Sequence, residues 1–455
     1  MNKHKRSTFS GKLGFVLSAA GASVGLGNIW RFPYLAAKYG GGIFLLIYII
    51  LALTFGYTLI MAETSLGRMT RKSPVGAFES FGNSRFISIG GWINAIIPIL
   101  IVPYYSVIGG WVIKYLIEYF AGHSKTLAGD AYFTTFISNG WSTEICFIIF
   151  TLFTLGIIYA GVRNGIERVS RFMMPILIVL SLIIAVYSVT RPGAIEGVKY
   201  FLVPNFDHFS WMTVVSAMGQ MFYSLSIAMG ILITFGSYMK KDTSIEKSTE
   251  NVEIFDTAIA IMAGLMIIPA VFAFSGGNAE TLKSGPALMF ITIPKVFANM
   301  GFGTAIGIVF FLLVLFAAVT SSIALTESAV STFEDELHWS RKKSTVFMGM
   351  VMLLLGTLSC LGYGPLANFK ILGMQFLDFF DFITNSVMMP IAAIATCLLV
   401  SKVVGVDKIE EEIKKDGQAF RRKKIFCFMI KYLCPLFAAI ILISSAANAF
   451  GIITM

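Results

Sequence analysis

Oxygen-bearing side chains interrupt several of the long apolar stretches in this chain. Asn28, Ser224, Ser226, Asp256 and Thr320-Ser321-Ser322 all lie inside such stretches. Amide, hydroxyl and carboxylate oxygens, together with backbone carbonyls, suit hard cations rather than soft metals. The residue types therefore predict a site for a monovalent cation, and sodium is the expected ion.

Some of these residues have a simpler interpretation. Asp256 has no basic neighbour in its own stretch, and a carboxylate inside a membrane needs a partner or an ion, but solvation near a helix end would also accommodate it. Thr320 and Ser321 can bond back to carbonyls of their own helix. The chain offers no hydrolytic constellation, so we expect no enzyme, no catalytic residue and no organic cofactor.

A glycine-rich break lies in the first apolar stretch. Gly21, Gly25 and Gly27 fall within the run that ends at Asn28. Each glycine costs about 1 kcal/mol of helix propensity relative to alanine, and unpaired backbone in hydrocarbon costs several kcal/mol per group. The break is explained if an ion or substrate at mid-membrane uses the freed backbone groups.

The composition predicts an all-α integral membrane protein. Of 455 residues, 56% are hydrophobic and 13% are charged. Eleven stretches are long enough to cross about 30 Å of hydrocarbon. They lie near residues 12–38, 43–67, 88–120, 143–161, 166–190, 211–239, 253–275, 300–333, 344–361, 372–401 and 427–451.

The net charge of +10 follows the membrane topology. Alternate connections hold the basic clusters, including the N-terminal leader and the run from Lys402 to Lys424, and six such regions contain 25 of the 35 Lys and Arg residues. By the positive-inside rule, the N-terminus is cytoplasmic and, with eleven spans, the C-terminus is outside. The distribution argues against nucleic acid as a partner and predicts a multi-pass protein of a bacterial-type plasma membrane, in contact with the lipid bilayer.

A second break gives the chain its internal organisation. The sixth stretch carries Ser224 and Ser226 between Gly219 and Gly230. It comes five spans after the first, so the two broken helices would enter the membrane from opposite sides, as in an inverted repeat. We predict one transporter domain over 1–455, with repeats at about 12–190 and 211–401 and an extra helix at about 427–451. Close helix packing alone could also explain either break taken singly.

Several motifs together resemble the neurotransmitter:sodium symporter family. They are Gly21 through Pro33, Gly40-Gly41-Gly42, Glu63, Tyr104-Tyr105, Gly165 through Arg168, Gln220 through Ser226, Thr320-Ser321-Ser322 and Glu334 through Leu337. The length and eleven spans resemble the bacterial amino-acid branch, which includes leucine, tyrosine and hydrophobic amino-acid transporters. The implied fold is a 5+5 inverted repeat with helices 1 and 6 broken.

The resemblance implies two sodium sites. The first would use the Ser23 carbonyl, Asn28, Ser224, Asp256 and the substrate carboxylate. The second would use the carbonyls of Gly21, Val24 and Ala317 and the hydroxyls of Thr320 and Ser321.

The resemblance also implies how an amino acid would bind. Its carboxylate would meet the amides of Leu26 and Gly27 and the Tyr105 hydroxyl, since the N-terminal end of a half-helix attracts anions. Its amine would meet the carbonyls of Ser23, Tyr223 and Ser226. The side-chain pocket would be lined by Ile101, Tyr105, Tyr223, Ala228, Met229, Ser321 and Leu325, and Ser224 is also expected to contact the substrate. Ala22 carries no charge to hold a monoamine, and flexible Met229 can adapt to a ring, so a hydrophobic or aromatic L-amino acid is expected.

Gates and departures follow from the same resemblance. Arg31 and Asp381 would form an outer ion pair, and Arg6 and Asp335 an inner one, with Phe9 in place of the usual tryptophan.

Animal members bind chloride with a Tyr, a Gln and two hydroxyls. Tyr48, Gln220 and Ser224 match, but Ala260 stands at the position of the second hydroxyl residue. Asp256 supplies a fixed negative charge, which predicts chloride independence.

Gly165 and Pro175 imply that the cytoplasmic half of span five unwinds to release sodium, with a static proline kink as the alternative.

These features predict a sodium-coupled symporter that works by alternating access. A proton-coupled amino-acid permease of the same fold is the nearer alternative, and a channel is a more distant one. The expected small-molecule partners are an L-amino acid and sodium.

Overall fold

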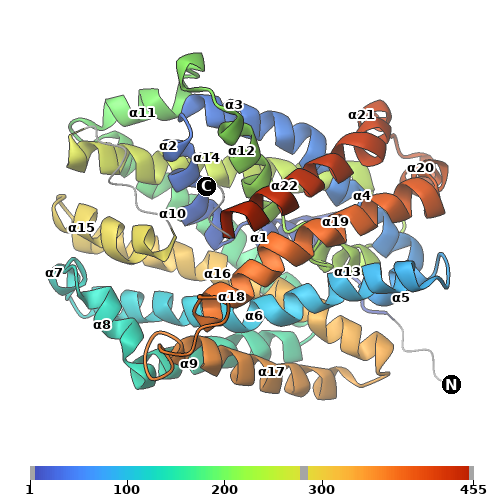
Figure 1. Ribbon diagram of the computed structural model, residues 1–455, viewed down its shortest axis with the longest axis horizontal. Helices are drawn as coiled ribbons and strands as arrows, with labels where there is room; N and C mark the ends of the chain where they lie inside the picture. The colour runs from blue at the N-terminus through green and yellow to red at the C-terminus, as the bar shows by residue number, and fades with distance from the viewer. Residues whose placement is uncertain (1–5, 277–284, 450–455) are drawn as a thin grey trace.

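The fold is a bundle of helices whose long axes run roughly side by side (Figure 1). The computed structural model describes residues 6–276 and 285–449. Within them the only β-structure is two isolated bridges, Gly41 with Pro204 and Ile371 with Met374. The predicted all-α membrane fold is confirmed.

Nine continuous helical segments among the described residues are long and apolar enough to span a bilayer. They are Gly42–Thr70, Arg85–Phe120, Gly140–Tyr159, Val162–Val189, Ile245–Ser275, Gly303–Glu336, Arg341–Leu361, Phe376–Val404 and Lys423–Asn448. The segments Lys12–Ser23 and Gly27–Lys38 meet at a bend of 54° and make a tenth candidate span.

The sixth predicted span is two short helices, α12 (Trp211–Ser224) and α13 (Ile231–Tyr238), separated by residues 225–230. Neither helix alone is long enough to cross a membrane, so the count of eleven spans stays a prediction. The ten candidates and this pair nevertheless fall at the positions of the eleven predicted stretches.

The spans are built from helices joined by short π-helical turns. The N-terminal half contains α1 (Lys12–Ser23), η1 (Gly27–Arg31), α2 (Phe32–Lys38), α3 (Gly42–Leu51), η2 (Ala52–Gly56), α4 (Tyr57–Thr70), α6 (Arg85–Phe120), α9 (Gly140–Tyr159), η3 (Val162–Glu167) and α10 (Arg168–Val189). The C-terminal half contains α12, α13, α14 (Ile245–Ser275), α16 (Gly303–Glu336), α17 (Arg341–Leu361), α18 (Phe376–Asp381), η7 (Phe382–Met388), α19 (Met389–Leu398), η8 (Leu399–Val404), α21 (Lys423–Phe428), η10 (Met429–Leu433) and α22 (Cys434–Ala449).

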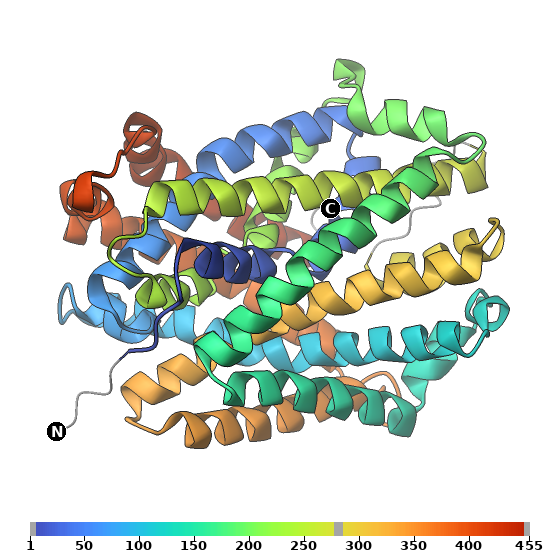
Figure 2. The ribbon, with the colours of Figure 1, turned by 180° about the vertical axis from the view of Figure 1, so that it is seen from behind.

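Shorter elements lie at the two ends of the bundle. They are α5 (Pro74–Glu79), α7 (Ser124–Leu127), α8 (Tyr132–Ser138), α11 (Ala194–Leu202), η4 (Phe206–His208), η6 (Leu288–Thr292), α15 (Ile293–Ala298), α20 (Val406–Ile413) and η9 (Lys415–Gly417). Seen from behind, the green helix α10 crosses the bundle diagonally (Figure 2).

Serine and asparagine caps define where several spans begin. Ser84 accepts a hydrogen bond from the Ile87 amide at the start of α6, and Asn139 accepts one from Ser142 at the start of α9. Ser210 and Thr213 form a capping box at α12. Such caps satisfy amides that have no partner inside the helix.

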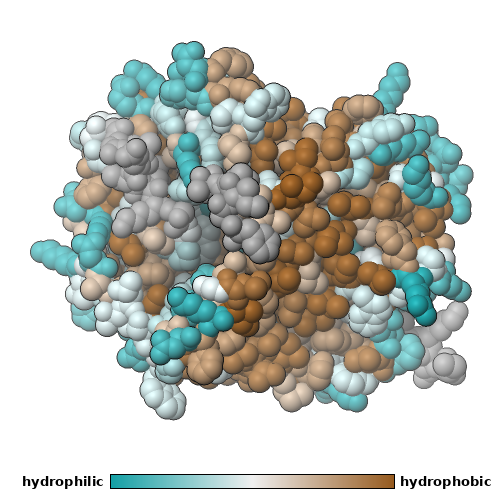
Figure 3. Space-filling view, in the orientation of Figure 1, coloured by the Kyte–Doolittle hydropathy of each residue, from teal (hydrophilic) through white to brown (hydrophobic). Residues whose placement is uncertain are grey.

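The inner helices are the ones that hold the predicted site. In the apolar windows of α6 and α16, 78% and 72% of residues are buried, against 39% in α9 and 33% in the last span. The space-filling view shows hydrophobic side chains across the middle of one face and hydrophilic ones gathered at its two ends (Figure 3). A bilayer in contact with this surface would meet the apolar band.

Candidate cation and substrate site

The two helix breaks face each other at the centre of the bundle. The Ser23 hydroxyl donates to the Leu225 carbonyl (3.3 Å), and the Ser226 hydroxyl donates to the Ala22 carbonyl (3.0 Å). Gln220 donates its side-chain amide to the Gly27 carbonyl (3.1 Å). The polar groups that a broken helix exposes are thus partly paired across the two breaks, as buried backbone requires.

The second break contains unusual backbone. Ser226, Ala228 and Gly230 have φ of 52°, 58° and 68°, and only glycine adopts this left-handed region without cost. Residues held in such conformations occur at functional sites. The strain therefore marks residues 226–230 as part of the site.

An acidic cluster lies where the breaks meet α14. Asn28 donates to Asp256 (2.8 Å) and to Ser224 (2.8 Å), and the Ser224 hydroxyl lies 2.9 Å from Asp256 Oδ2. The Tyr48 hydroxyl donates to Asp256 at 3.2 Å. All four side chains are buried.

Asp256 takes these hydrogen bonds from neutral groups. Its donors Asn28, Ser224 and Tyr48 carry no positive charge, and none of the ion pairs formed by described residues includes it. A buried charge is normally paired or coordinates an ion. The cluster has the oxygen donors that fit a sodium ion, and the geometry excludes simple solvation near a helix end because Asp256 is fully buried.

A second group of oxygens lies between α1 and α16. The Ser321 hydroxyl is 3.3 Å from the Gly21 carbonyl, 3.1 Å from that of Ala22 and 3.4 Å from that of Val24. Thr320 donates to its own helix carbonyls at Phe316 (2.9 Å) and Ala317 (3.2 Å). Ser321 therefore reaches across to the broken helix, whereas Thr320 makes the back-bond that the sequence left open as an alternative.

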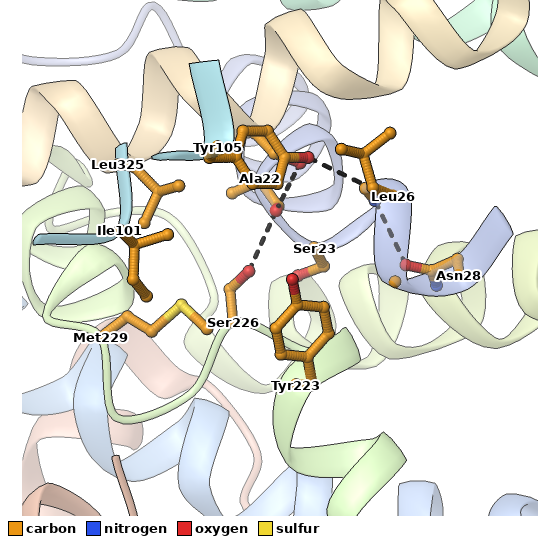
Figure 4. Close-up of a pocket in the computed structure, with 13 residues that line it drawn as sticks. Ala22, Ser23, Leu26, Asn28, Ile101, Tyr105, Tyr223, Ser226, Met229 and Leu325 are labelled. Carbon is orange, nitrogen blue, oxygen red and sulfur yellow. Dashed lines mark hydrogen bonds between the residues drawn. The ribbon is translucent and has the colours of Figure 1, made fainter. Parts of the chain in front are cut away.

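A small cavity lies beside both oxygen groups (Figure 4). About 30 Å³ of it is open to the centre of a water-sized sphere. Its lining is Ala22, Ser23, Gly25, Leu26, Gly27, Asn28, Ile101, Tyr105, Tyr223, Ser226, Met229, Ser321 and Leu325. An amino acid larger than this space would need lining side chains to move apart.

Nearly all residues predicted to touch substrate line this cavity. Ser224 and Ala228 are the exceptions, because Ser224 points into the acidic cluster and Ala228 belongs to the backbone held by Glu63. The Leu26 amide donates to the Tyr105 hydroxyl at 3.3 Å, so two of the three groups expected to hold a carboxylate are already adjacent.

Two glycines of the first break are needed for close approach. A Cβ on Gly25 would lie 2.7 Å from Ser321 Oγ, and a Cβ on Gly27 would lie 2.4 Å from the Tyr223 ring. Gly25 lines the cavity but was not among the predicted site residues. Gly25 could have been predicted from the sequence, because it lies between two predicted ligands, Val24 and Leu26, in a glycine-rich run.

Glu63 is a further residue to which no role was assigned. It is buried on α4, and its Oε1 accepts a hydrogen bond from the Ala228 amide at 2.7 Å. The bond holds the strained part of the second break against α4. An acidic residue inside an apolar stretch was the signal in the sequence.

The predicted inner pair is in contact. One guanidinium nitrogen of Arg6 lies 2.7 Å from Asp335 Oδ1 and 2.8 Å from Oδ2. Arg6 also donates to Ser237 and Ser331, and Asp335 accepts from the Ser73 amide at 2.6 Å. Phe9 is buried beside this network.

Phe9 packs edge-on against three aromatic rings, those of Phe15, Phe235 and Tyr238. Its backbone amide donates to the Tyr238 carbonyl at 3.0 Å. The Phe9 ring is therefore fully packed at this end of the bundle.

The predicted outer pair is not in direct contact. The Arg31 guanidinium lies over the Tyr223 ring, 5.2 Å from its centroid, and no ion pair within 4.0 Å joins it to Asp381 among the described residues. Asp381 accepts instead from Tyr104 (3.1 Å) and Asn385 (2.6 Å). The expectation of a direct contact is wrong for this conformation, because neutral donors and an aromatic face hold the two charges apart.

Comparison with known proteins gives consistent matches. The family model described as "Sodium:neurotransmitter symporter family" matches residues 6–153 and 137–452. An uncharacterized sodium-dependent transporter of Bacillus subtilis, YhdH, is 33% identical, with all of both chains covered. Another from Haemophilus influenzae is 31% identical over 98% of this chain and 99% of the relative.

A solved structure is also similar. The crystal structure of MhsT in complex with L-phenylalanine matches with a TM-score of 0.87 and 33% identity. The match covers 97% of this chain and all of MhsT.

Proposed function

Because the chain belongs to the sodium:neurotransmitter symporter family, we propose that it imports a hydrophobic or aromatic L-amino acid together with sodium. The protein is a multi-pass membrane protein, a sodium-coupled transporter and not an enzyme. The proposal adds the substrate class, two sodium sites, independence of chloride and a cytoplasmic N-terminus.

One observation carries the proposal. A single small cavity is bordered by backbone of the first break, by Asn28 of the acidic cluster and by Ser321 of the second oxygen group. A bound amino acid would therefore touch both oxygen groups at once. Its carboxylate at Leu26 and Gly27 would complete the shell of a cation beside Asn28, so each ligand would raise the affinity for the other.

The far side of the cavity supports an apolar substrate. Ile101, Met229 and Leu325 face the space away from the broken helix (Figure 4). No charged side chain lines the cavity among the described residues. A charged substrate side chain would lose its hydration there without gaining a partner.

Transport follows from exchange between two states. We expect the Arg6–Asp335 network to close one end of the bundle, and Tyr105 and Tyr223, which line the cavity, to close over the substrate toward the other end. Release of substrate and sodium toward the Arg6 side requires that network to open. We place this side in the cytoplasm because Arg6 belongs to one of the basic clusters, which the positive-inside rule assigns to the cytoplasm.

Uptake into proteoliposomes tests the proposal. We expect an inward sodium gradient to drive uptake of L-phenylalanine or L-leucine, with no stimulation by chloride. Asn28→Ala is expected to abolish sodium-driven uptake, whereas Ser142→Ala, at the start of α9, leaves it unchanged. Uptake that persists without sodium and follows a pH gradient would contradict the proposal and favour a proton-coupled permease.

A further inference from the structure

An apolar groove lies outside the transport site, where α5, α6 and α19 converge. It measures about 250 Å³, some eight times the central cavity. We call it the Phe78 groove. Its lining is Phe78, Phe86, Ile87, Ala395, Leu398, Leu399, Lys402 and Val403.

Close helix packing creates the floor of this groove. Gly90 on α6 lies so near its neighbours that a Cβ there would be 2.9 Å from the Phe78 ring and 3.0 Å from the Ala395 Cβ. The walls rise outward from this contact, because Phe86 and Val403 are 59% and 43% exposed. The result is a hollow in the surface rather than a gap inside the core.

The groove lies at the same end of the molecule as the inner pair. The Ser73 amide, at the start of α5, donates to Asp335, which in turn binds Arg6. In Figure 1 α5 lies toward the right of the bundle. The hydrophobic surface in the middle of Figure 3 borders this end.

Positive charge lies at the edge of an otherwise apolar lining. Among the described residues, Lys402 is the one charged residue that lines the groove, and Arg85 directly precedes Phe86 at the start of α6. The nearest carboxylate along α5 is Glu79, which already accepts a hydrogen bond from Ser88 at 2.7 Å. An apolar hollow with lysine at its rim matches a ligand with a hydrocarbon tail and an anionic head.

We propose that the Phe78 groove binds one acyl chain of an anionic phospholipid, with its phosphate held by Lys402 and Arg85. The lipid would come from the leaflet on the Arg6 side of the membrane. The tail lies against Phe78, Ala395 and Leu398 and buries apolar surface that protein side chains leave open. Lysine and arginine near the interface attract anionic headgroups.

Native mass spectrometry of the full-length protein tests this proposal. The detergent-purified protein is mixed with phosphatidylglycerol or with phosphatidylcholine bearing the same acyl chains. We expect the wild type to retain one phosphatidylglycerol in preference to phosphatidylcholine. Lys402→Gln should reduce that preference about fivefold, since one lysine near a membrane surface contributes on that scale.

Substitutions that fill the groove distinguish binding of the acyl tail from binding of the headgroup. Leu398→Trp should abolish retention of the preferred lipid, and Ala395→Leu, a smaller change, should weaken it if the tryptophan variant fails to fold. Lys424→Gln, at an exposed lysine on α21, is the matched control and should keep the wild-type preference. Equal retention of the two lipids by the wild type, or wild-type retention by both groove variants, would overturn the proposal.

Discussion

At the scale of single residues, we expect Asp256 to have the greatest effect on ion use. It is a buried carboxylate whose described donors are all neutral. A fixed negative charge there would balance a bound sodium without chloride.

We therefore expect Asp256→Asn to weaken sodium activation of transport at least tenfold. Loss of the charge leaves the cation without electrostatic compensation in a poorly polar environment. Added chloride should restore part of the activity, measured as uptake against sodium concentration with chloride or gluconate. Asp207→Asn, an exposed change in η4, serves as the control. Wild-type sodium activation in the Asp256 variant would refute this role.

We expect Met229 to determine the space for the substrate side chain. It lines the cavity with Ile101 and Leu325, and methionine adapts its shape more readily than a ring. We expect Met229→Phe to reduce the preference for L-phenylalanine over L-valine by roughly tenfold, because the added ring removes volume. Competition uptake measures this ratio, with Met350→Phe on the exposed face of α17 as control. An unchanged ratio would place the substrate side chain elsewhere.

The sequence singled out most residues of the candidate site but not the contacts between them. Asn28, Asp256 and Ser321 could be singled out because polar residues in apolar stretches need partners. Gly25 and Glu63 were not predicted as site residues. The close approach at Gly25 and the bond from a distant backbone amide to Glu63 depend on how α1, α4 and the second break pack. The expected Arg31–Asp381 contact is absent in this conformation, since Arg31 lies over the Tyr223 ring of another element and Asp381 accepts from Asn385, four residues further along the same span.

At the scale of elements, α10 contains a proline within a continuous helix. Pro175 lies in the middle of Arg168–Val189, and the preceding turn η3 is π-helical. This conformation is wound through Pro175, so the unwinding of span five remains a prediction. Ser10 and Arg171 both bind Glu167 at the start of this helix and fasten it to the N-terminal segment.

We expect Pro175→Ala to slow transport about tenfold and to lower the fraction of inward-open molecules. Alanine favours the wound helix by up to about 3 kcal/mol relative to proline. Accessibility of an introduced cysteine on the Arg6 side measures the open fraction. Pro192→Ala, in the exposed turn after α10, should change neither quantity. A wild-type rate for Pro175→Ala would leave the proline as a static kink.

The two breaks could be located from glycine and serine content, but their pairing could not. Ser23 with Leu225 and Ser226 with Ala22 are contacts between segments about 200 residues apart. The observed break, residues 225–230, lies within the stretch from Gly219 to Gly230 that the sequence marked, and it leaves α12 and α13 too short to count as one continuous span.

At the scale of the whole molecule, a buried ion pair ties the loop before the last span to the rest of the bundle. Arg68 on α4 donates to Glu412 on α20 at 2.7 Å, and the two side chains are 0% and 4% exposed. Arg68 also donates to the Thr243 carbonyl at 2.6 Å, in the connection between α13 and α14. The pair joins three segments that are far apart in the sequence.

Glu412→Gln should lower the thermal midpoint by roughly 5 °C, because it leaves the Arg68 charge buried without its partner. Burial alone would raise the pKa of Glu412, but hydrogen bonds from Lys415 and Arg68 hold that pKa below its ordinary value. The carboxylate therefore contributes stability above the ordinary glutamate pKa of about 4.3, and the contribution is lost as pH falls through the lower folded value.

The difference in midpoint between wild type and Glu412→Gln should accordingly stay constant from about pH 6 to pH 8. Fluorescence-detected melting in detergent measures it, and Glu411→Gln, a neighbouring change on α20, serves as the control. A difference that disappears as pH falls from 8 to 6 would contradict this account of Glu412.

The central claim is that sodium and an amino acid share one site, and equilibrium binding tests it most directly. Binding of radiolabelled L-phenylalanine to the purified protein is measured while sodium is replaced by potassium at constant ionic strength and pH. The account predicts that the dissociation constant falls as sodium rises, and that Asn28→Ala removes this dependence. An affinity that is the same with and without sodium would contradict the account.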